Sequence, residues 1–299
     1  MSAVREQLDP ERVRRSFDAA AATYDGVAVL QREVGKRLLG RLDPLRIDPA
    51  HILDLGCGTG AAVQGLLSRY PKARVIGADL SRNMLERAQA ALPWSERWLR
   101  RRVSWVCADL HALPFPTDCF QLVFSNLTLQ WSRDVSVALD ELQRVTAPGG
   151  AVMFTTFGPR TLSELRDAWS QVDRHSHVHE FTDLHDVGDA MLQAGYLDPV
   201  IDSEDFTLTY QQPREAMREL KLLGARNAAK DRARSLMSPH RLAQVEAAYK
   251  AAYRLSDGRV PVTYEVVYGH AWGIEGRPQR MDSTGEVRID PSTIQRRRR

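Results

Sequence analysis

The sequence lacks long apolar runs and contains few cysteines. No stretch approaches the roughly 18 consecutive apolar residues that a membrane-spanning helix needs, and the charged segment Met1–Arg15 has no apolar signal core. The three cysteines, Cys57, Cys107 and Cys119, show neither CxxC nor zinc-type spacing. An odd number of thiols suits a reducing compartment. We therefore expect a cytoplasmic protein with no membrane segment and no metal.

The chain also lacks a strong charge bias and the commonest nucleotide-binding fingerprints. Its formal net charge of +3 is too small to indicate nucleic-acid binding. Part of that charge lies in Arg296–Arg299, at the end of a polar, patternless tail (275–299) that we predict to be disordered. The glycine-rich stretch matches neither Gly-x-Gly-x-x-Gly nor a P-loop. With 43% hydrophobic and 26% charged residues, the composition is that of an ordinary globular protein.

What the chain does contain is a strand, a glycine turn and a helix in succession. The apolar run His51–Leu55, interrupted by Asp54, predicts a strand, and Ala61–Arg69 predicts an amphipathic helix. This arrangement brings backbone close to a nucleotide-like ligand, because a Cβ atom would block the approach. The glycines of the turn stand at alternate positions: Gly56, Gly58 and Gly60.

Two further predicted strands end beside acidic residues. Ala73–Ala78 runs into Asp79, about twenty residues past the turn, where a carboxylate can accept hydrogen bonds from ribose hydroxyls. Val103–Cys107 is followed by Ala108, Asp109 and Leu110. Three consecutive strands thus reach a polar residue at the carboxyl end, which is the edge where open α/β sheets bind ligands.

This set resembles the class I S-adenosylmethionine-dependent methyltransferases, whose first motif is similar to Asp54–Gly60. The resemblance implies S-adenosylmethionine as cofactor and S-adenosylhomocysteine as product. It also implies that Asp79 holds the ribose and that Asp109 with Leu110 contacts adenine. The cofactor-binding residues that it implies are Asp54, Gly56, Cys57, Gly58, Gly60, Asp79, Leu80, Met84, Asp109, Leu110, Asn126 and Leu127.

Several of these assignments have alternatives. The glycines could be structural in an unrelated Rossmann-like domain. Leu80 and Met84 are equally expected as plain core residues, and Cys57 is read as a small residue in the turn in preference to a reactive thiol. Tyr24 is either a lid residue over the cofactor or a packed aromatic beside a turn.

The periodicity along the chain predicts an α/β fold. The pattern predicts seven strands with a helical insertion before the last one. The methyltransferase resemblance implies that they form a Rossmann-like doubly wound sheet, mostly parallel with an antiparallel last strand, with N-terminal lid helices. The further predicted strands are Phe120–Phe124, Ala151–Thr156, Val200–Tyr210 and Val260–Trp272. The predicted divisions are lid helices (1–45), cofactor-binding core (46–210), insertion (211–259), last core strand (260–274) and tail (275–299).

One histidine cluster falls outside these motifs. His175, His177 and His179 occupy alternate positions after a predicted helix, Thr161–Val172. A metal site would need a fourth ligand, and none is evident, so we read the stretch as a polar loop.

A narrower resemblance covers about residues 9 to 273. These stretches are similar to the malonyl-acyl-carrier-protein O-methyltransferases of biotin synthesis: Ala21–Asp25, Leu30–Gln31, Ser125–Trp131, Phe154–Pro159, Met217–Ala225 and Pro261–Glu265. The implied reaction moves a methyl group from S-adenosylmethionine to the free carboxylate of a malonyl thioester on acyl carrier protein. A carboxylate is ionised at neutral pH, so no general base is required.

The resemblance and the chemistry suggest substrate-binding residues. Tyr24 and Asn126 would position the reactants, and an arginine could hold the malonyl group. The substrate candidates are Tyr24, Gln31, Arg160, Arg226 and Tyr264. Exposed arginines of the insertion would steer an acidic carrier protein: Arg214, Arg218, Arg226, Arg232 and Arg234.

Two other functions stay open. The insertion also resembles methyltransferase-like assembly factors of respiratory complex I, which act on a partner protein. A methyltransferase for a small free acid is the third possibility. Dependence on a carrier protein would distinguish the malonyl-acyl-carrier-protein methyltransferase from a small-acid methyltransferase. Chemistry on an arginine side chain would instead identify an assembly factor.

Overall fold

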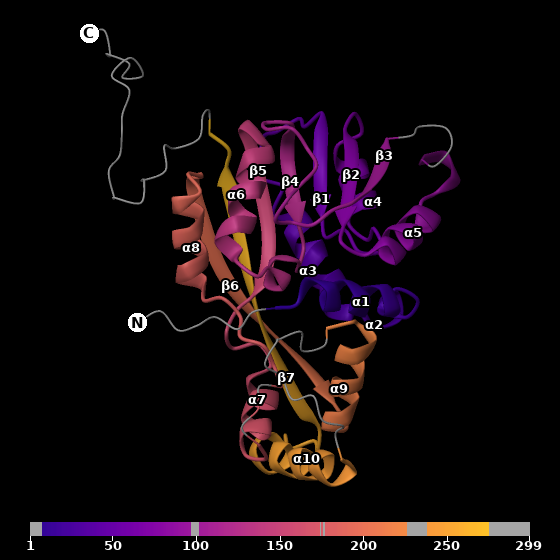
Figure 1. Ribbon diagram of the computed structural model, residues 1–299, viewed down its shortest axis with the longest axis vertical. Helices are drawn as coiled ribbons and strands as arrows, with labels where there is room; N and C mark the ends of the chain where they lie inside the picture. Colours follow the sequence, from indigo (N-terminus) through magenta and orange to yellow (C-terminus); the bar gives the residue numbers. More distant parts are fainter. Residues whose placement is uncertain (1–7, 97–101, 174, 176, 226–237, 275–299) are drawn as a thin grey trace, which may run out of the picture.

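The computed structural model describes residues 8–96, 102–173, 175, 177–225 and 238–274. Seven strands form one sheet in the order β3-β2-β1-β4-β5-β7-β6 (Figure 1). Neighbouring strands from β3 to β5 are parallel, and β7 is antiparallel to both β5 and β6. This confirms the predicted fold class. The strands are β1 (His51–Leu55), β2 (Arg74–Asp79), β3 (Val103–Cys107), β4 (Phe120–Ser125), β5 (Thr146–Phe157), β6 (Leu197–Tyr210) and β7 (Val260–Trp272).

Helices cover both faces of the sheet because alternate strand residues point to opposite sides. Ile52 of β1 packs with Leu38 and Leu66 on one face, whereas Leu53 packs with Leu139 on the other. The helices are α1 (Pro10–Ala20), α2 (Tyr24–Val27), α3 (Val29–Gly40), α4 (Val63–Arg69), α5 (Arg82–Ala91), α6 (Val135–Val145), α7 (Ser163–Ser170), α8 (Leu184–Gln193), α9 (Pro213–Leu222) and α10 (Pro239–Tyr253).

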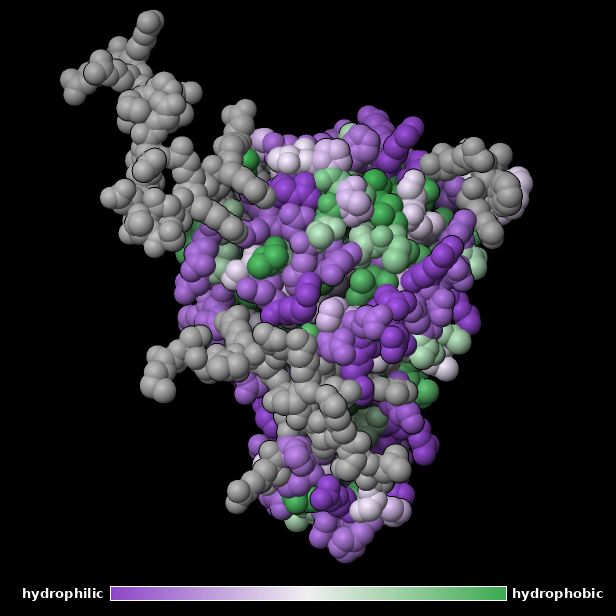
Figure 2. All heavy atoms as spheres, in the orientation of Figure 1, coloured by the Kyte–Doolittle hydropathy of each residue, from purple (hydrophilic) through white to green (hydrophobic). Residues whose placement is uncertain are grey.

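One connection of the sheet contains no helix. The chain passes from β3 to β4 through residues 108–119, which the structure describes as turns and an isolated bridge. Figure 2 shows the face of the molecule that is turned to the viewer in Figure 1. Its surface is mainly hydrophilic, with apolar side chains gathered over part of the sheet.

Side chains cap the starts of two helices. The Asp9 carboxylate accepts from the backbone N–H groups of Glu11 and Arg12 at the start of α1. The Ser81 hydroxyl accepts from the N–H of Met84 at the start of α5. Such caps satisfy donors that the first helical turn leaves unpaired.

The start of β5 differs from the prediction. We expected Ala151, because Pro148, Gly149 and Gly150 normally end regular structure, but the strand begins at Thr146. Gly149 and Gly150 instead exchange backbone hydrogen bonds with Gly273, of 2.9 and 2.8 Å. The end of the chain's last strand therefore holds this stretch in an extended conformation.

The β6–β7 ribbon extends beyond the rest of the sheet. β5 pairs only with Val266–Trp272 of β7, whereas β6 pairs along the whole of it. The free half of the ribbon carries α7, α9 and α10 (Figure 1). The two helices of the predicted insertion, α9 and α10, thus lie between the last two strands. The predicted tail (275–299) lies outside the described residues.

Candidate functional site

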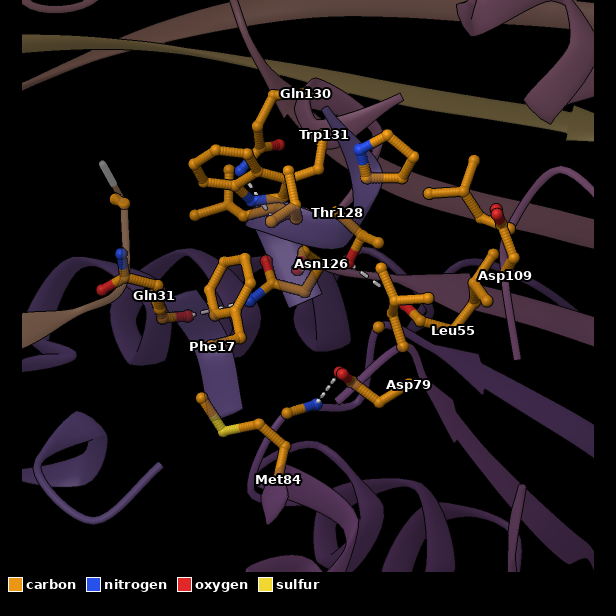
Figure 3. Close-up of a pocket in the computed structure, with 18 of the residues that line it drawn as sticks. Phe17, Gln31, Leu55, Asp79, Met84, Asp109, Asn126, Thr128, Gln130 and Trp131 are labelled. Atoms are coloured by element: carbon orange, nitrogen blue, oxygen red, sulfur yellow. Dashed lines mark hydrogen bonds between the residues drawn. The ribbon is translucent and has the colours of Figure 1, made fainter. Parts of the chain in front are cut away.

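A pocket of about 960 Å³ opens at the carboxyl ends of β1 to β4. The order of the sheet reverses between β1 and β4, and ligands of open α/β sheets bind at such a crevice. Figure 3 shows Asp79 and Met84 on one side of the pocket, with Asn126, Gln130 and Trp131 across from them.

The glycine turn forms part of the pocket wall. Gly56 and Gly58 have φ values of 66° and 53°, a left-handed backbone that favours glycine. A Cβ atom on Gly56 would lie 1.9 Å from Thr128 Oγ1, so this glycine is needed for close packing. Among the described residues, a Cβ atom on Gly58 would contact Tyr24 Cε1 alone, at 4.0 Å. The lack of a side chain at Gly58 therefore keeps that volume of the pocket open.

Two carboxyl groups lie at this turn. Asp79 accepts from the N–H groups of Gly58 and Ser81, at 2.9 and 2.8 Å. Burial nevertheless raises the pKa of Asp79 to about 6. Asp54 is 2% exposed, and within the described part of the chain its Oδ2 has no hydrogen-bond partner. Burial and the nearby Asp79 raise the pKa of Asp54 to about 7. A cationic ligand would stabilise the ionised forms of both groups.

Asp109 is held by the residue two positions later. The backbone N–H of His111 donates to Asp109 at 2.9 Å, and the imidazole Nδ1 lies 2.7 Å from the same oxygen. Since the N–H of Arg133 donates to His111 Nε2, at 3.2 Å, the ring proton of a neutral His111 sits on Nδ1. Partial burial opposes ionisation, but the hydrogen bonds from His111 lower the pKa of Asp109. A fixed carboxylate therefore lies at the pocket edge.

Asn126 joins three elements at the end of β4. Its Nδ2 donates to the carbonyl oxygen of Gln31 in α3, and its Oδ1 accepts from Thr155 of β5, each at 2.9 Å. The next residue, Leu127, has a φ of 50° and donates its N–H to Thr155. A left-handed non-glycine residue of this kind marks a locally strained backbone, which is frequent at functional sites.

The N-terminal helices cover the pocket. Asp18 of α1 accepts from the Ser81 hydroxyl at 2.7 Å, and the Thr59 hydroxyl of the glycine turn donates to Asp25 of α2 at 2.6 Å. Burial, with Asp79 nearby, raises the pKa of Tyr24, so its phenol stays protonated. Together these contacts tie the lid to the turn and to α5.

Most of the predicted cofactor residues line this pocket. They are Gly56, Gly58, Asp79, Leu80, Met84, Asp109, Leu110, Asn126 and Leu127. Asp54, Cys57 and Gly60 do not line it and instead support the turn from beneath. Cys57 is buried, and burial raises the pKa of its thiol, which favours the small-residue reading over a reactive thiol.

The predicted substrate residues are more scattered. Tyr24 and Gln31 line the pocket. Arg160 does not: its guanidinium lies 2.8 Å from Asp205 and 3.1 Å from Glu265, so we leave it out of the substrate assignment. Tyr264 lines a second cavity next to the first, and Arg226 lies outside the described residues.

Several lining residues had no assignment from the sequence. His111 carried no signal beyond its proximity to Asp109. Phe17 and Val13 come from α1, one of the helices predicted only as a lid. The ring of Trp131 lies edge-on to that of Phe17, with 5.2 Å between the ring centroids. The added lining residues include Val13, Phe17, His111, Thr128, Gln130, Trp131 and Phe157.

Two features are absent from the described residues. They contain no group of three or more His, Cys, Asp or Glu side chains arranged to hold a metal ion. Within the same part of the chain, no helix has the length and apolar character to cross a membrane.

Comparison with known proteins decides the family. Residues 53–154 match the Methyltransferase domain family. A malonyl-(acyl-carrier protein) O-methyltransferase from Halorhodospira halophila is 63% identical over 98% of both chains. One from Methylovorus sp. is 45% identical over 97% of this chain and 98% of its own. The chain belongs to the malonyl-(acyl-carrier protein) O-methyltransferase family. Likeness to this family extends through α9 and α10, beyond the methyltransferase domain, and confirms the resemblance found in the sequence.

Solved structures agree on the fold. The YcgJ protein of Bacillus subtilis has a TM-score of 0.56 at 17% identity, covering 81% of this chain and 100% of its own. Phosphoethanolamine N-methyltransferase 2 of Haemonchus contortus, solved with phosphomonomethylethanolamine and S-adenosylhomocysteine, has a TM-score of 0.55 at 19% identity. It covers 88% of this chain and 61% of its own. The malonyl-(acyl-carrier protein) O-methyltransferase family thus shares a methyltransferase fold.

Proposed function

We propose that this protein transfers a methyl group from S-adenosylmethionine to the free carboxylate of malonyl-acyl carrier protein. The product would be the methyl ester that serves as a primer in biotin (pimeloyl) synthesis. The observation that carries the proposal is the 63% identity, over nearly the full length, to a relative named for this reaction. The α9–α10 segment, where methyltransferases for other substrates would differ, is included in that similarity.

The pocket suits S-adenosylmethionine on its own chemistry. Asp79 offers carboxylate oxygens for ribose hydroxyls, and Gly58 leaves room for a ligand against backbone. The unpartnered Oδ2 of buried Asp54 and the raised pKa values at this turn favour a ligand that brings positive charge. S-adenosylmethionine carries such charge on its sulfonium and its ammonium.

This reaction requires the protein to orient the reactants and requires no proton transfer. S-adenosylmethionine supplies a methyl carbon made electrophilic by the attached sulfonium. In the transfer, a carboxylate oxygen would bond to this carbon as the carbon–sulfur bond broke, with the electron pair left on sulfur. No proton moves, because a carboxyl group with a pKa near 4 is already ionised. Holding the two reactants in line can supply about 7–11 kcal/mol of the barrier.

The residues around the pocket serve that task. The lid contacts of Asp18 and Asp25 hold α1 and α2 against one side of the pocket. Asn126 fixes the wall between α3 and β5. Tyr24, which stays protonated, can donate a hydrogen bond without competing as a base.

The carrier-protein partner rests on the family name and on charge. Of the five arginines expected to steer an acidic carrier, Arg214 and Arg218 are described. The Arg214 guanidinium is held by the buried carboxylate of Glu246, whereas Arg218 is exposed on the same helix. Arg218 is therefore the better candidate for attracting the carrier.

The test is transfer of label from methyl-labelled S-adenosylmethionine to a panel of acceptors. We expect label on malonyl-carrier protein, released by mild base as an ester would be, with little on malonyl-coenzyme A, free malonate or acetyl-carrier protein. Asp79→Ala should abolish this transfer. Absence of label on every acceptor, with S-adenosylmethionine still bound, would contradict the proposal. It would favour an assembly factor that acts on another protein.

A further inference from the structure

A second cavity of about 460 Å³ adjoins the cofactor pocket. Trp131, Phe157 and Ala225 line both, so the two spaces meet at these side chains. The second cavity is mostly apolar, and its lining comes from α7, from the loop before α8, from α9 and from β7. Its apolar side chains include Leu162, Leu165, Val178, Phe181 and Leu220.

Two polar side chains in this lining are already paired. The Thr161 hydroxyl donates to the carbonyl oxygen of Glu265 and accepts from the N–H of the same residue, each at 3.1 Å. His177 Nε2 lies 2.9 Å from the Asp173 carboxylate, and its ring stacks on Trp169 at 3.6 Å. Neither group is available to a ligand.

The Tyr264 hydroxyl is also committed. It is hydrogen-bonded to the Tyr210 hydroxyl, which in turn donates to Glu219 at 2.9 Å. This chain of hydroxyls leads away from the cofactor pocket, so Tyr264 contributes its ring to the cavity and not a hydrogen bond.

His179 is different. Its ring is 7% exposed, and its Nε2 is buried with no hydrogen-bond partner among the residues that the structure describes. The ring lies 5.3 Å from Trp131 and 4.5 Å from Phe181, which fix its position in the wall. Burial, reinforced by the charge of Arg166, lowers the pKa of His179 to about 4, so the imidazole is neutral at physiological pH. A buried polar atom without a partner costs about 1–3 kcal/mol, which a ligand would recover.

We propose that this cavity holds the thioester end of the acceptor, with His179 Nε2 donating a hydrogen bond to the thioester carbonyl oxygen. The inference rests on the proposed function. In a malonyl thioester a single methylene separates the carboxylate from the thioester carbonyl. When the carboxylate faces the methyl donor in the first pocket, the carbonyl therefore falls in the adjoining space. The carbonyl offers only acceptor oxygen, so Nε2 carries the proton.

A neutral donor in an apolar wall would favour an uncharged acceptor group. A thioester places an uncharged group in the cavity, whereas free malonate would place a second carboxylate there and bury its charge among apolar side chains, which is costly. His179 is thus a specificity-determining residue that touches the acceptor and takes no part in bond making.

The test compares two histidine variants with a matched control. His179→Leu removes the donor and roughly keeps the volume, while His179→Gln keeps a donor. His270→Leu is the control, because His270 Nε2 is also buried without a partner but lines a separate cavity beside Tyr268. Steady-state kinetics with malonyl-carrier protein, S-adenosylhomocysteine affinity and melting temperature are measured for each.

We expect His179→Leu to raise the KM for malonyl-carrier protein by roughly 3- to 10-fold, as loss of one neutral hydrogen bond predicts. Its melting temperature and S-adenosylhomocysteine affinity should not fall, His179→Gln should restore most of the KM, and His270→Leu should match wild type. An unchanged KM in His179→Leu, or equal effects in both Leu variants, overturns the inference. A wild-type protein that does not methylate malonyl-carrier protein overturns instead the proposed function.

Discussion

Asp54 and Asp79 are a pair of carboxyl groups whose ionisation responds to what the pocket contains. Their pKa values, about 7 and about 6, lie well above the ordinary value for aspartate because both groups are buried, and the charge of Asp79 raises the pKa of Asp54 further. The folded protein thus keeps protons that the unfolded chain would release. The stability from this source is present at low pH and is lost as pH rises through 6 and 7. A bound cation would reverse that loss by favouring the ionised forms.

Binding of S-adenosylmethionine should therefore release protons and strengthen with pH. We expect its Kd to fall between pH 5.5 and 8, by up to about tenfold for each pH unit and each proton released. Calorimetry in buffers of different ionisation enthalpy measures the protons directly. Asp54→Asn should release fewer protons than wild type. A Kd that stays constant over this range would show that these carboxyl groups do not sense the ligand.

Gly58→Ala separates strain in the turn from obstruction of the pocket. The new Cβ atom would enter the space beside Tyr24, so we expect at least a tenfold weaker affinity for S-adenosylhomocysteine. The left-handed φ should also cost about 1–2 kcal/mol of stability. Binding is measured by calorimetry and stability by denaturant unfolding.

Gly149→Ala is the matched control for that change. Gly149 has a φ of 69°, no atom lies within 4 Å of the position that a Cβ atom would take there, and the residue lies outside the pocket lining. It should lose similar stability and keep wild-type affinity. Equal losses of affinity in both variants would mean that backbone strain, and not the pocket, explains the effect.

At the scale of single residues, the sequence predicted those residues whose role depends on neighbouring positions in the chain. The glycine turn and Asp79 follow from spacing after a strand, so their places could be predicted. Arg160 could not be judged, because its partners Asp205 and Glu265 come from distant strands. His179 was read as part of a polar loop, since the lack of a partner for its Nε2 arises only from packing.

Among the elements, the lid depends on a few contacts with the cofactor-binding turn. Asp18 accepts from the Ser81 hydroxyl, and Ser81 in turn caps α5. The carbonyl oxygen of Asp18 also accepts from Asn83, at 3.0 Å. Docking of α1 and the start of α5 are thus one hydrogen-bonded unit, so the lid and the ligand pocket should open together.

Asp18→Ala should loosen the lid. Hydrogen bonds to a charged group contribute about 1.5–3 kcal/mol, and we expect part of this to appear as a roughly 5- to 10-fold higher Kd for S-adenosylmethionine. Hydrogen exchange in α1 should become faster. Glu11→Ala, on the exposed side of the same helix, should change neither quantity. If the two variants behave alike, the Asp18 contact does not hold the lid.

The ends of helices and strands can be predicted from the sequence where adjacent residues alone determine them. The caps at Asp9 and Ser81 depend on neighbouring residues alone, so signals of this kind can be read from the sequence. The early start of β5 was missed, because Gly273, more than a hundred residues along the chain, supplies its hydrogen bonds. Long-range pairing overrode the turn signal of Pro148–Gly150.

Over the whole molecule, the β6–β7 ribbon brings the insertion to the ligand edge of the sheet. α9 contacts the lid directly: the Thr23 hydroxyl donates to the carbonyl oxygen of Leu222, at 3.1 Å. The second cavity is lined by α7, the loop before α8, α9 and β7, so its shape depends on elements far apart in the chain. The fold class could be predicted from the succession of strands and helices along the chain, but the second cavity could not. The proposed division of the chain into core and insertion stays a prediction.

The exposed Arg218 of α9 offers a test of how the carrier protein is attracted. Arg218→Glu should lower kcat/KM for malonyl-carrier protein several-fold at low salt, because charge reversal weakens steering. The effect should fade as salt is raised, and it should be absent with malonyl-pantetheine, which lacks the acidic protein. Arg87→Glu, an exposed change on α5, should have no effect. A loss that persists with malonyl-pantetheine would instead indicate damage to the site.

The most direct test of the account is a crystal structure with S-adenosylhomocysteine and malonyl-pantetheine bound together. We predict that the nucleoside product occupies the pocket beside Asp79 and Gly58. The thioester should lie in the second cavity, with its carbonyl oxygen hydrogen-bonded to His179 and its carboxylate turned toward the first pocket. A thioester bound anywhere else, or a nucleoside outside the pocket at the glycine turn, would contradict the account.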